Sequence, residues 1–109
     1  MRAYGAENSV MDFEWDEKKA LVTARERGLT FEIAAAVLLS GNLLVKQDKR
    51  RDYGEDRYQA IGRYDGREIV VVYTFRGDRT RIISARKAHD NEQRAYRSVF
   101  GIPGGARPH

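Results

Sequence analysis

Three β-rich segments joined by two short turns limit the possible folds of this chain more than any other feature. The segments are Arg57–Tyr64, Glu68–Phe75 and Arg79–Arg86, and each is rich in Val, Ile, Tyr or Thr. The turns centre on Asp65-Gly66 and Gly77-Asp78. Such pairs favour tight hairpins because they tolerate positive φ angles. The pattern therefore predicts an antiparallel meander of three strands.

Two helices are predicted ahead of the strands. Asp16 can cap a first helix over Glu17–Arg27, and Gly28 stands where helices commonly end. Thr30 can cap a second helix, FEIAAAVLLS, which is apolar almost throughout and should be buried on much of its surface. Because only a very short loop separates them, we expect the two helices to form a helical hairpin.

A fourth strand and a third helix complete the expected fold. Leu43–Asp48 alternates like a strand, and the polar segment QDKRRDYGED before the meander predicts an exposed loop. A last helix is expected over DNEQRAYRSVF, with Tyr96, Val99 and Phe100 on its buried side. The predicted fold class is α+β: an N-terminal helical hairpin, an antiparallel sheet of about four strands and a C-terminal helix.

The length of 109 residues fits one domain. We place this domain at residues 13–100. Residues 1–12 are expected to be a flexible N-terminal extension, and residues 101–109, rich in glycine and proline, a flexible tail.

The net charge of +4 is unevenly distributed along the chain. Residues 1–45 hold five basic and seven acidic residues, a balance of −2, whereas residues 46–97 hold fourteen basic and nine acidic, a balance of +5. A basic half favours a polyanionic partner, most commonly a phosphate backbone. Charge that only confers solubility is the alternative.

The cellular compartment follows from two absences. The sequence has no cysteine, which is compatible with a reducing cytoplasm, and its N-terminus lacks an apolar signal core. The longest apolar run, Ile33–Leu39, is far shorter than the roughly 20 residues that span a bilayer. We therefore expect a cytoplasmic protein without a membrane partner.

Several enzyme classes are disfavoured by the residues available. His89 and His109 are the only histidines, too few for a zinc site with three histidine or cysteine ligands. Phosphate-cradling glycine loops and the nucleophile-elbow motif are missing as well. We expect neither a metal nor a cofactor.

Arginines on strands remain as candidates for chemistry. Side chains alternate along a strand, so Arg81 and Arg86 are predicted to lie on opposite faces unless the strand end bends. Arg63 on a neighbouring strand is a third candidate. Guanidinium groups stay charged and bind phosphate oxygens in pairs. Ion pairs with Asp56, Glu68 or Glu92 are the structural alternative.

Several motifs in order resemble the BrnT toxins of type II toxin–antitoxin systems. They are FEWDEKKA, GLTFEIAAAV, Asp56-Arg57 before AIG, GREIVVVYT and RIISARKA, followed by Glu92 and Tyr96. The likeness covers about residues 13–96. It implies a RelE-like fold, a ribonuclease that arrests growth, and a cognate BrnA-like antitoxin. That antitoxin would neutralise the toxin and bind the operator DNA. The toxin would contact this DNA only through the antitoxin.

One motif departs from the family pattern. Where the family usually reads Asn-x-x-Lys-His-Gly, this chain has Thr23, Glu26 and Arg27 before Gly28. If the family histidine transfers protons, Arg27 cannot replace it, because a guanidinium does not lose its proton near neutral pH. Arg27 can still stabilise anionic charge.

The resemblance implies metal-independent cleavage in which the RNA 2′-hydroxyl attacks the adjacent phosphate. The expected catalytic residues have long polar or charged side chains: Arg63, Arg81, Arg86, Arg27 and Tyr96. For proton transfer, Glu92 and His89 are alternatives to Tyr96. The expected contacts with the RNA backbone come from Lys19, Arg57 and Arg79.

Two other functions remain open at this point. The departures at Thr23, Glu26 and Arg27 would also suit a toxin-fold protein that has lost its chemistry and serves as an antitoxin-binding co-repressor. A general RNA-binding domain is less favoured, because the chain lacks the aromatic signature of such sheets: Tyr73 and Phe75 could equally belong to the core.

Overall fold

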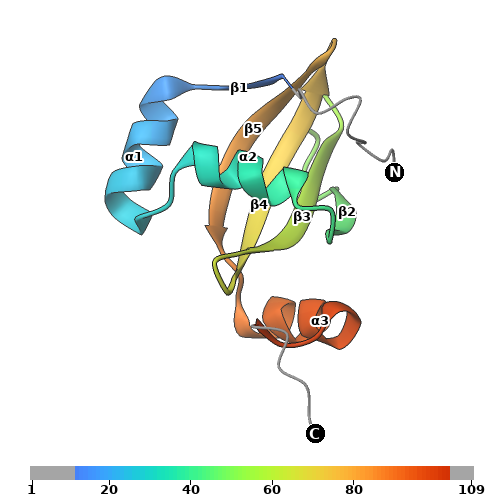
Figure 1. The fold of residues 1–109 in the computed structure, drawn as a ribbon. Coiled ribbons are helices and arrows are strands. Elements are labelled where there is room, and N and C mark those ends of the chain that lie inside the picture. Colours follow the sequence, from blue (N-terminus) through green and yellow to red (C-terminus); the bar gives the residue numbers. More distant parts are fainter. Residues whose placement is uncertain (1–11, 104–109) are drawn as a thin grey trace, which may run out of the picture.

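A five-stranded mixed sheet with three helices forms an α+β fold (Figure 1). The structure is a computed structural model that describes residues 12–103. Its elements in chain order are β1 Phe13–Trp15, α1 Glu17–Arg27, α2 Phe31–Leu39, β2 Leu44–Asp48, β3 Arg57–Tyr64, β4 Arg67–Arg76, β5 Arg79–Lys87 and α3 Asp90–Phe100. The predicted extension 1–12 and tail 101–109 lie outside the described residues, except for Asp12 and residues 101–103.

Both predicted ends of the first helix and the predicted start of the second are confirmed. The Asp16 carboxylate accepts the backbone N–H of Lys18 at 2.9 Å, and Gly28 ends α1 with φ +64°. The Thr30 hydroxyl accepts the N–H of Ile33 at 3.1 Å at the start of α2. Short polar side chains at these positions thus satisfy helix N–H groups that have no partner within the helix.

The strand order is β1-β5-β4-β3-β2. The meander β3-β4-β5 is antiparallel as predicted, and Asp65 and Gly66 both have positive φ, 51° and 77°, as a type I′ hairpin requires. The prediction of about four antiparallel strands is wrong in one respect: β1 adds a fifth strand, parallel to β5. Three residues are too few to show alternation, so this strand is fixed by tertiary contacts such as Thr80 N–H to Asp12 C=O, 2.8 Å.

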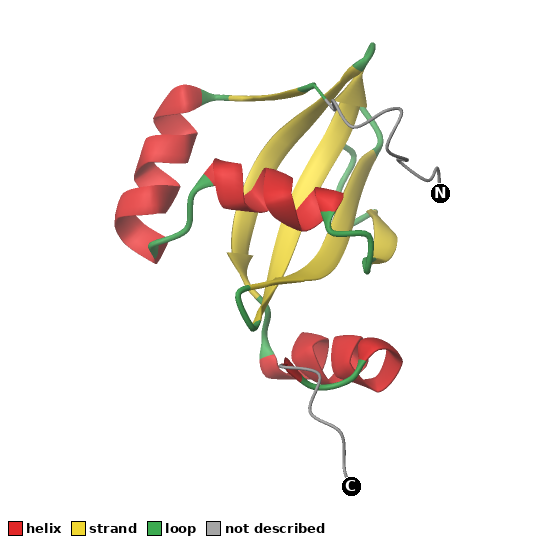
Figure 2. Cartoon of the chain, viewed as in Figure 1, coloured by secondary structure: helices red, strands yellow, loops and turns green. Residues whose placement is uncertain are grey.

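The expected helical hairpin is not formed in the usual sense. Figure 2 shows α2 lying across one face of the sheet, while α1 stands beside it and α3 lies beyond one end of the strands. The composition of the helices explains this arrangement. In α2 Phe31, Ala34 and Val37 are fully buried, whereas α1 buries only Ala20 and Thr23. The apolar helix therefore packs on the sheet rather than on its neighbour.

The core lies between α2 and the covered face of the sheet. β4 contributes Ile69 and Val71, and β5 contributes Ile82 and Ala85. At Gly62 of β3 the neighbouring side chains leave no room for a Cβ atom. A Cβ atom there would lie 2.7 Å from the side chains of both Val37 and Leu43.

The predicted buried side of α3 is only partly right. Tyr96 is 2% exposed and Phe100 is half-buried, but Val99 is 59% exposed. The helix contacts the end of the sheet rather than a whole face, so a narrow side is sufficient to bury Tyr96. Within residues 12–103, no helix is long and apolar enough to cross a membrane.

The predicted loop between β2 and β3 is largely exposed but begins at a buried carboxylate. Asp48 accepts two side-chain hydrogen bonds from Arg50, at 2.8 and 2.7 Å, and one from the Tyr53 hydroxyl at 3.2 Å. These bonds, chiefly those from Arg50, hold the pKa of Asp48 far below its usual value although burial opposes the shift. The charged loop is therefore anchored at its start.

Candidate functional site

A β-bulge at Ile83 decides which arginines share a face of the sheet. The pairing of β4 with β5 shifts by one residue between Val72 and Tyr73, so Ile83 has no direct partner. The extra residue reverses the alternation along β5. Arg81 and Arg86 therefore lie on the same face, and the prediction that they lie on opposite faces is wrong. We call this face, which α2 does not cover, the open face.

Arg79 and Arg81 share one carboxylate on the open face. Glu14 of β1 pairs in register with Arg81, and its oxygens lie 3.2 Å from Arg81 Nη1 and 3.8 Å from Arg79 Nη1. The contact with Arg81 is a hydrogen bond. One acidic side chain thus partly neutralises a predicted catalytic arginine, Arg81, and a predicted RNA-binding arginine, Arg79.

Arg63 is bound within a network that attaches α3 to the sheet. Its guanidinium donates to Glu68 at 2.8 and 3.0 Å and to the carbonyls of Gly101 and Ile102. Arg97 of α3 donates to the same carboxylate at 2.8 Å. Burial raises the pKa of Glu68, but the hydrogen bonds from Arg97 and Arg63 outweigh it, so the pKa lies below its usual value.

Tyr96 points into the protein. Its hydroxyl donates to the carbonyl of Asn42 at 2.8 Å, and its ring packs on Phe100 with centroids 4.8 Å apart. The Arg63 guanidinium lies 5.0 Å from the ring centre, a cation–π contact. Burial raises the pKa of the tyrosine. The structure therefore places this predicted catalytic residue in an anchoring position.

Arg86 and His89 meet at Glu92. The carboxylate accepts two hydrogen bonds from Arg86, at 2.8 and 2.9 Å, and the backbone N–H of His89 at 2.8 Å. The Nδ1 atom of His89 lies 3.6 Å from the same carboxylate. The hydrogen bonds from Arg86 are the main cause that lowers the pKa of Glu92 to about 2. Glu92 is thus anionic and orients both neighbours.

Arg27 binds the edge of β5 at the part of the strand that β1 does not reach. The short β1 pairs only with Thr80, Arg81 and Ile82, so the C-terminal half of β5 has no neighbouring strand on the side of β1. There Arg27 Nη1 donates to the carbonyl of Ala85 at 2.8 Å. The bond satisfies an edge carbonyl and brings a guanidinium from α1 to the strand end.

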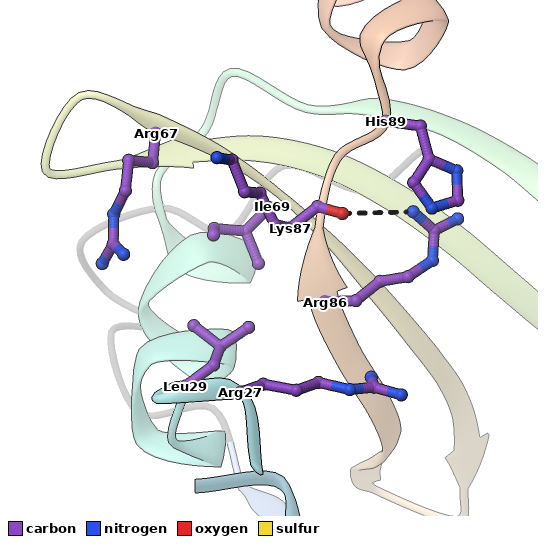
Figure 3. A pocket seen from close by; sticks show the side chains of 7 residues that line it. All are labelled: Arg27, Leu29, Arg67, Ile69, Arg86, Lys87 and His89. Atoms are coloured by element: carbon purple, nitrogen blue, oxygen red, sulfur yellow. Dashed lines mark hydrogen bonds between the residues drawn. The ribbon is translucent and has the colours of Figure 1, made fainter.

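These groups surround a pocket of about 360 Å³ at the end of β5 (Figure 3). We call it the basic pocket. It is lined by Arg27, Leu29, Arg67, Ile69, Arg86, Lys87 and His89. Four of the seven are permanently cationic near neutral pH, one is a histidine, and none is acidic. Concentrated positive charge above an apolar floor suits a bound phosphate.

The basic pocket extends around the strand end from one face to the other. Arg86 pairs with Val70 and lies on the open face, whereas Lys87 pairs with Ile69 on the face that α2 covers. In Figure 3 the side chains of Lys87 and Arg86 leave β5 in different directions, with His89 drawn near Arg86. The pocket therefore has two sides that differ in chemistry.

The remaining predicted RNA contacts do not line the basic pocket. Arg57 donates to Glu55 at 3.1 Å, and its guanidinium lies 4.3 Å from the centre of the Tyr53 ring. Lys19 is exposed in the first turn of α1. Partial burial, followed by the positive charge of Arg57, lowers its pKa.

Of the residues that line the basic pocket, Arg27, Arg86 and His89 were candidates from the sequence, whereas Arg67 and Lys87 were not. Arg67 follows the Asp65-Gly66 turn, and Lys87 ends the last strand. The hairpin at Gly77-Asp78 places the first residue of β4 near the last residue of β5, so this second turn was a usable signal. Within residues 12–103, no group of three or more carboxylates and histidines is placed to hold a metal ion.

Comparison with known proteins identifies one family. A family model described as "Ribonuclease toxin, BrnT, of type II toxin-antitoxin system" matches residues 15–92, more than two thirds of the chain. The match includes Arg27, Arg67, Arg86, Lys87 and His89. A search of the curated proteins finds no match.

Proposed function

The chain belongs to the BrnT family, the ribonuclease toxins of type II toxin–antitoxin systems, and we propose that it cleaves RNA in the basic pocket. The proposal includes a RelE-like fold, cleavage without a metal ion, and a cognate BrnA-like antitoxin that neutralises the toxin. In this proposal the toxin contacts operator DNA only through that antitoxin.

The observation that carries this proposal is the lining of the basic pocket. Arg27, Arg67, Arg86 and Lys87 provide positive charge around one cavity, and no acidic side chain lines it. A phosphodiester gains a second negative charge as it approaches the transition state of cleavage. Fixed cationic donors stabilise that charge, and loss of one such donor commonly costs about 100- to 1000-fold in rate.

His89 is the one side chain lining the basic pocket whose ring nitrogens can both accept and donate a proton. In the proposed step the 2′-oxygen forms a bond to phosphorus and the bond from phosphorus to the 5′-oxygen breaks. The proton of the 2′-hydroxyl passes to the neutral imidazole of His89, and the leaving 5′-oxygen takes a proton from solvent. The products are a 2′,3′-cyclic phosphate and a 5′-hydroxyl. Glu92, 3.6 Å from Nδ1, favours the imidazolium that forms.

The other predicted site residues receive supporting roles in this proposal. Arg79 and Arg81 contact the RNA backbone along the open face, where Glu14 competes with phosphate. Arg57 and Lys19 add positive charge farther from the basic pocket. Arg63 and Tyr96 hold α3, and with it His89, against the sheet.

Replacing His89 by asparagine tests the proposed chemistry. Asparagine is a favourable residue at a helix N-cap, so His89→Asn removes the proton acceptor while preserving the start of α3. The side chain is 68% exposed, and its replacement leaves no cavity. We expect kcat for cleavage of single-stranded RNA, measured with excess chelator, to fall at least about 100-fold.

The control is thermal unfolding, which should give the same midpoint for wild type and His89→Asn within a few degrees. If chelator abolishes RNA cleavage by the wild type, cleavage without a metal ion is rejected. Equal kcat in the two proteins would reject His89 as the proton acceptor.

One observation favours the alternative of a non-catalytic co-repressor. Arg27 stands where the resemblance to the family expects a histidine, and one of its nitrogens donates to the Ala85 carbonyl. Induction of the chain without its antitoxin separates the two functions. A ribonuclease toxin should arrest growth, and a co-repressor should not.

A further inference from the structure

The basic pocket contains two kinds of cation, tethered and free. Arg27 is bound to a backbone carbonyl and Arg86 to Glu92. In contrast, the side chains of Arg67 and Lys87 form no hydrogen bond or ion pair within residues 12–103. Both are exposed. We propose that Arg67 and Lys87 form a subsite for the phosphate next to the scissile one in single-stranded RNA, an inference that rests on the proposed ribonuclease function.

The register of the sheet places the two free cations together. Lys87 pairs with Ile69, and Arg67 lies two residues before Ile69 on β4, so it projects from the same face. Such diagonal neighbours have Cα atoms about 7–8 Å apart, within reach of long side chains. Arg67 and Lys87 can therefore bind one phosphate from two sides.

The subsite is separate from the proposed catalytic groups. Arg86 and His89 lie on the side of the basic pocket that meets Glu92, whereas Arg67 and Lys87 lie on the side of Ile69. In Figure 3 Arg67 lies at the left and His89 at the right of the group of labelled side chains. A chain of successive phosphates could thus pass from one side to the other across the strand end.

The chemistry of this side favours backbone binding over base recognition. Leu29 and Ile69 beneath it are buried, at 3% and 1% exposure, and provide little surface for stacking. No aromatic ring lies on this side among the lining residues. Binding should therefore depend on charge and be insensitive to the flanking base. An acidic segment of an antitoxin could use the same cations, but the pocket's enclosure by five basic groups favours a strand with several phosphates.

The experiment measures binding of a fluorescent hexanucleotide with 2′-deoxyribose at the scissile position, which the 2′-hydroxyl chemistry cannot cleave. The variant Arg67→Ser/Lys87→Ser should raise Kd at least tenfold. Loss of one phosphate contact should also reduce the slope of log Kd against log salt by about 0.7. On the cleavable RNA, the variant should raise KM more than it lowers kcat.

The matched control is Lys49→Ser/Arg51→Ser, which removes the same charge from exposed residues in the loop after β2. The strand order puts β2 at one edge of the sheet, with β3 and β4 between it and β5. The control should change Kd less than twofold. Circular dichroism verifies that both double variants are folded.

The outcomes distinguish this subsite from the proposed function. If the wild type binds the deoxy oligonucleotide and the Arg67→Ser/Lys87→Ser variant binds it more weakly, the subsite is supported even when the wild type does not cleave RNA. An equal effect of both double variants would show general electrostatics and overturn the subsite. Unchanged RNA binding, or a loss confined to antitoxin binding, would overturn it as well.

Discussion

Glu92 connects two residues of the proposed active site, Arg86 and His89. It accepts two hydrogen bonds from Arg86 and one from the His89 backbone, and lies close to the His89 ring. The carboxylate does not line the basic pocket. It can therefore orient the two groups without placing negative charge against the RNA phosphate.

The ion pair of Glu92 makes a pH-dependent contribution to stability. The folded-state pKa of about 2 lies below the ordinary value of 4.5, chiefly because of Arg86. The stabilisation is therefore complete above about pH 5 and is lost as the pH falls toward 2. We expect the difference in unfolding free energy between wild type and Glu92→Gln to narrow by about 1–2 kcal/mol between pH 5 and pH 3.

Urea unfolding at pH 5, 4 and 3, monitored by circular dichroism, gives this difference directly. Glu26→Gln, which replaces an exposed carboxylate outside the Arg86–Glu92 pair, is the control and should show a smaller change. A difference for Glu92→Gln that stays constant with pH would contradict the assignment of an ionised Glu92 paired with Arg86.

The packing of α2 on the sheet leaves no room for a side chain at Gly62. Gly62 lies beneath Val37, and a methyl group there would lie 2.7 Å from Val37 and from Leu43. Its φ is not in the left-handed region, so alanine fits the backbone and only the contact is unfavourable. We expect Gly62→Ala to destabilise the fold by about 1–3 kcal/mol.

A double-mutant cycle checks the cause. Val37→Ala shortens one of the two side chains above Gly62, so Gly62→Ala/Val37→Ala should be less destabilised than the sum of the single variants in urea unfolding. Additive losses would show that the alanine does not act through this contact.

The elements themselves were largely predictable, because caps, turns and hydrophobic periodicity are local signals. Asp16, Gly28 and Asp65-Gly66 act in the structure as their sequence contexts predict. Two features were not predictable in this way. The strand at residues 13–15 is too short for a pattern, and the bulge at Ile83 depends on how β5 pairs with β4. Both are set by tertiary contacts.

The candidate site was less predictable than the fold for the same reason. The arginines were visible in the sequence, and Glu68 and Glu92 were named as alternative ion-pair partners that the structure pairs with Arg63 and Arg86. Glu14 was not found, because it lies 67 residues from Arg81 in the sequence. A one-residue shift in β5 moves every later side chain to the other face. This shift turns Arg86 to the open face and Lys87 to the face of α2, which gives the basic pocket its two sides.

The positive charge of the whole molecule lies mainly in two regions. Much of it is paired with carboxylates along the open face and its loop, as in Arg79, Arg81 and Arg57. The basic pocket at the end of β5 holds the cations without an acidic neighbour in its lining. Four cationic side chains and His89 therefore gather at the end of β5 without a carboxylate in the lining of the pocket.

Mapping the RNA contact by NMR tests the central claim most directly, namely that RNA binds in the basic pocket. The same non-cleavable oligonucleotide is titrated into ¹⁵N-labelled protein, and the shifts of the backbone amides are followed. Binding in the basic pocket predicts the largest shifts at Arg27, Leu29, Arg67 and residues 86–89. Shifts confined to Arg57, Arg79 and Arg81, with the pocket amides unchanged, would contradict it.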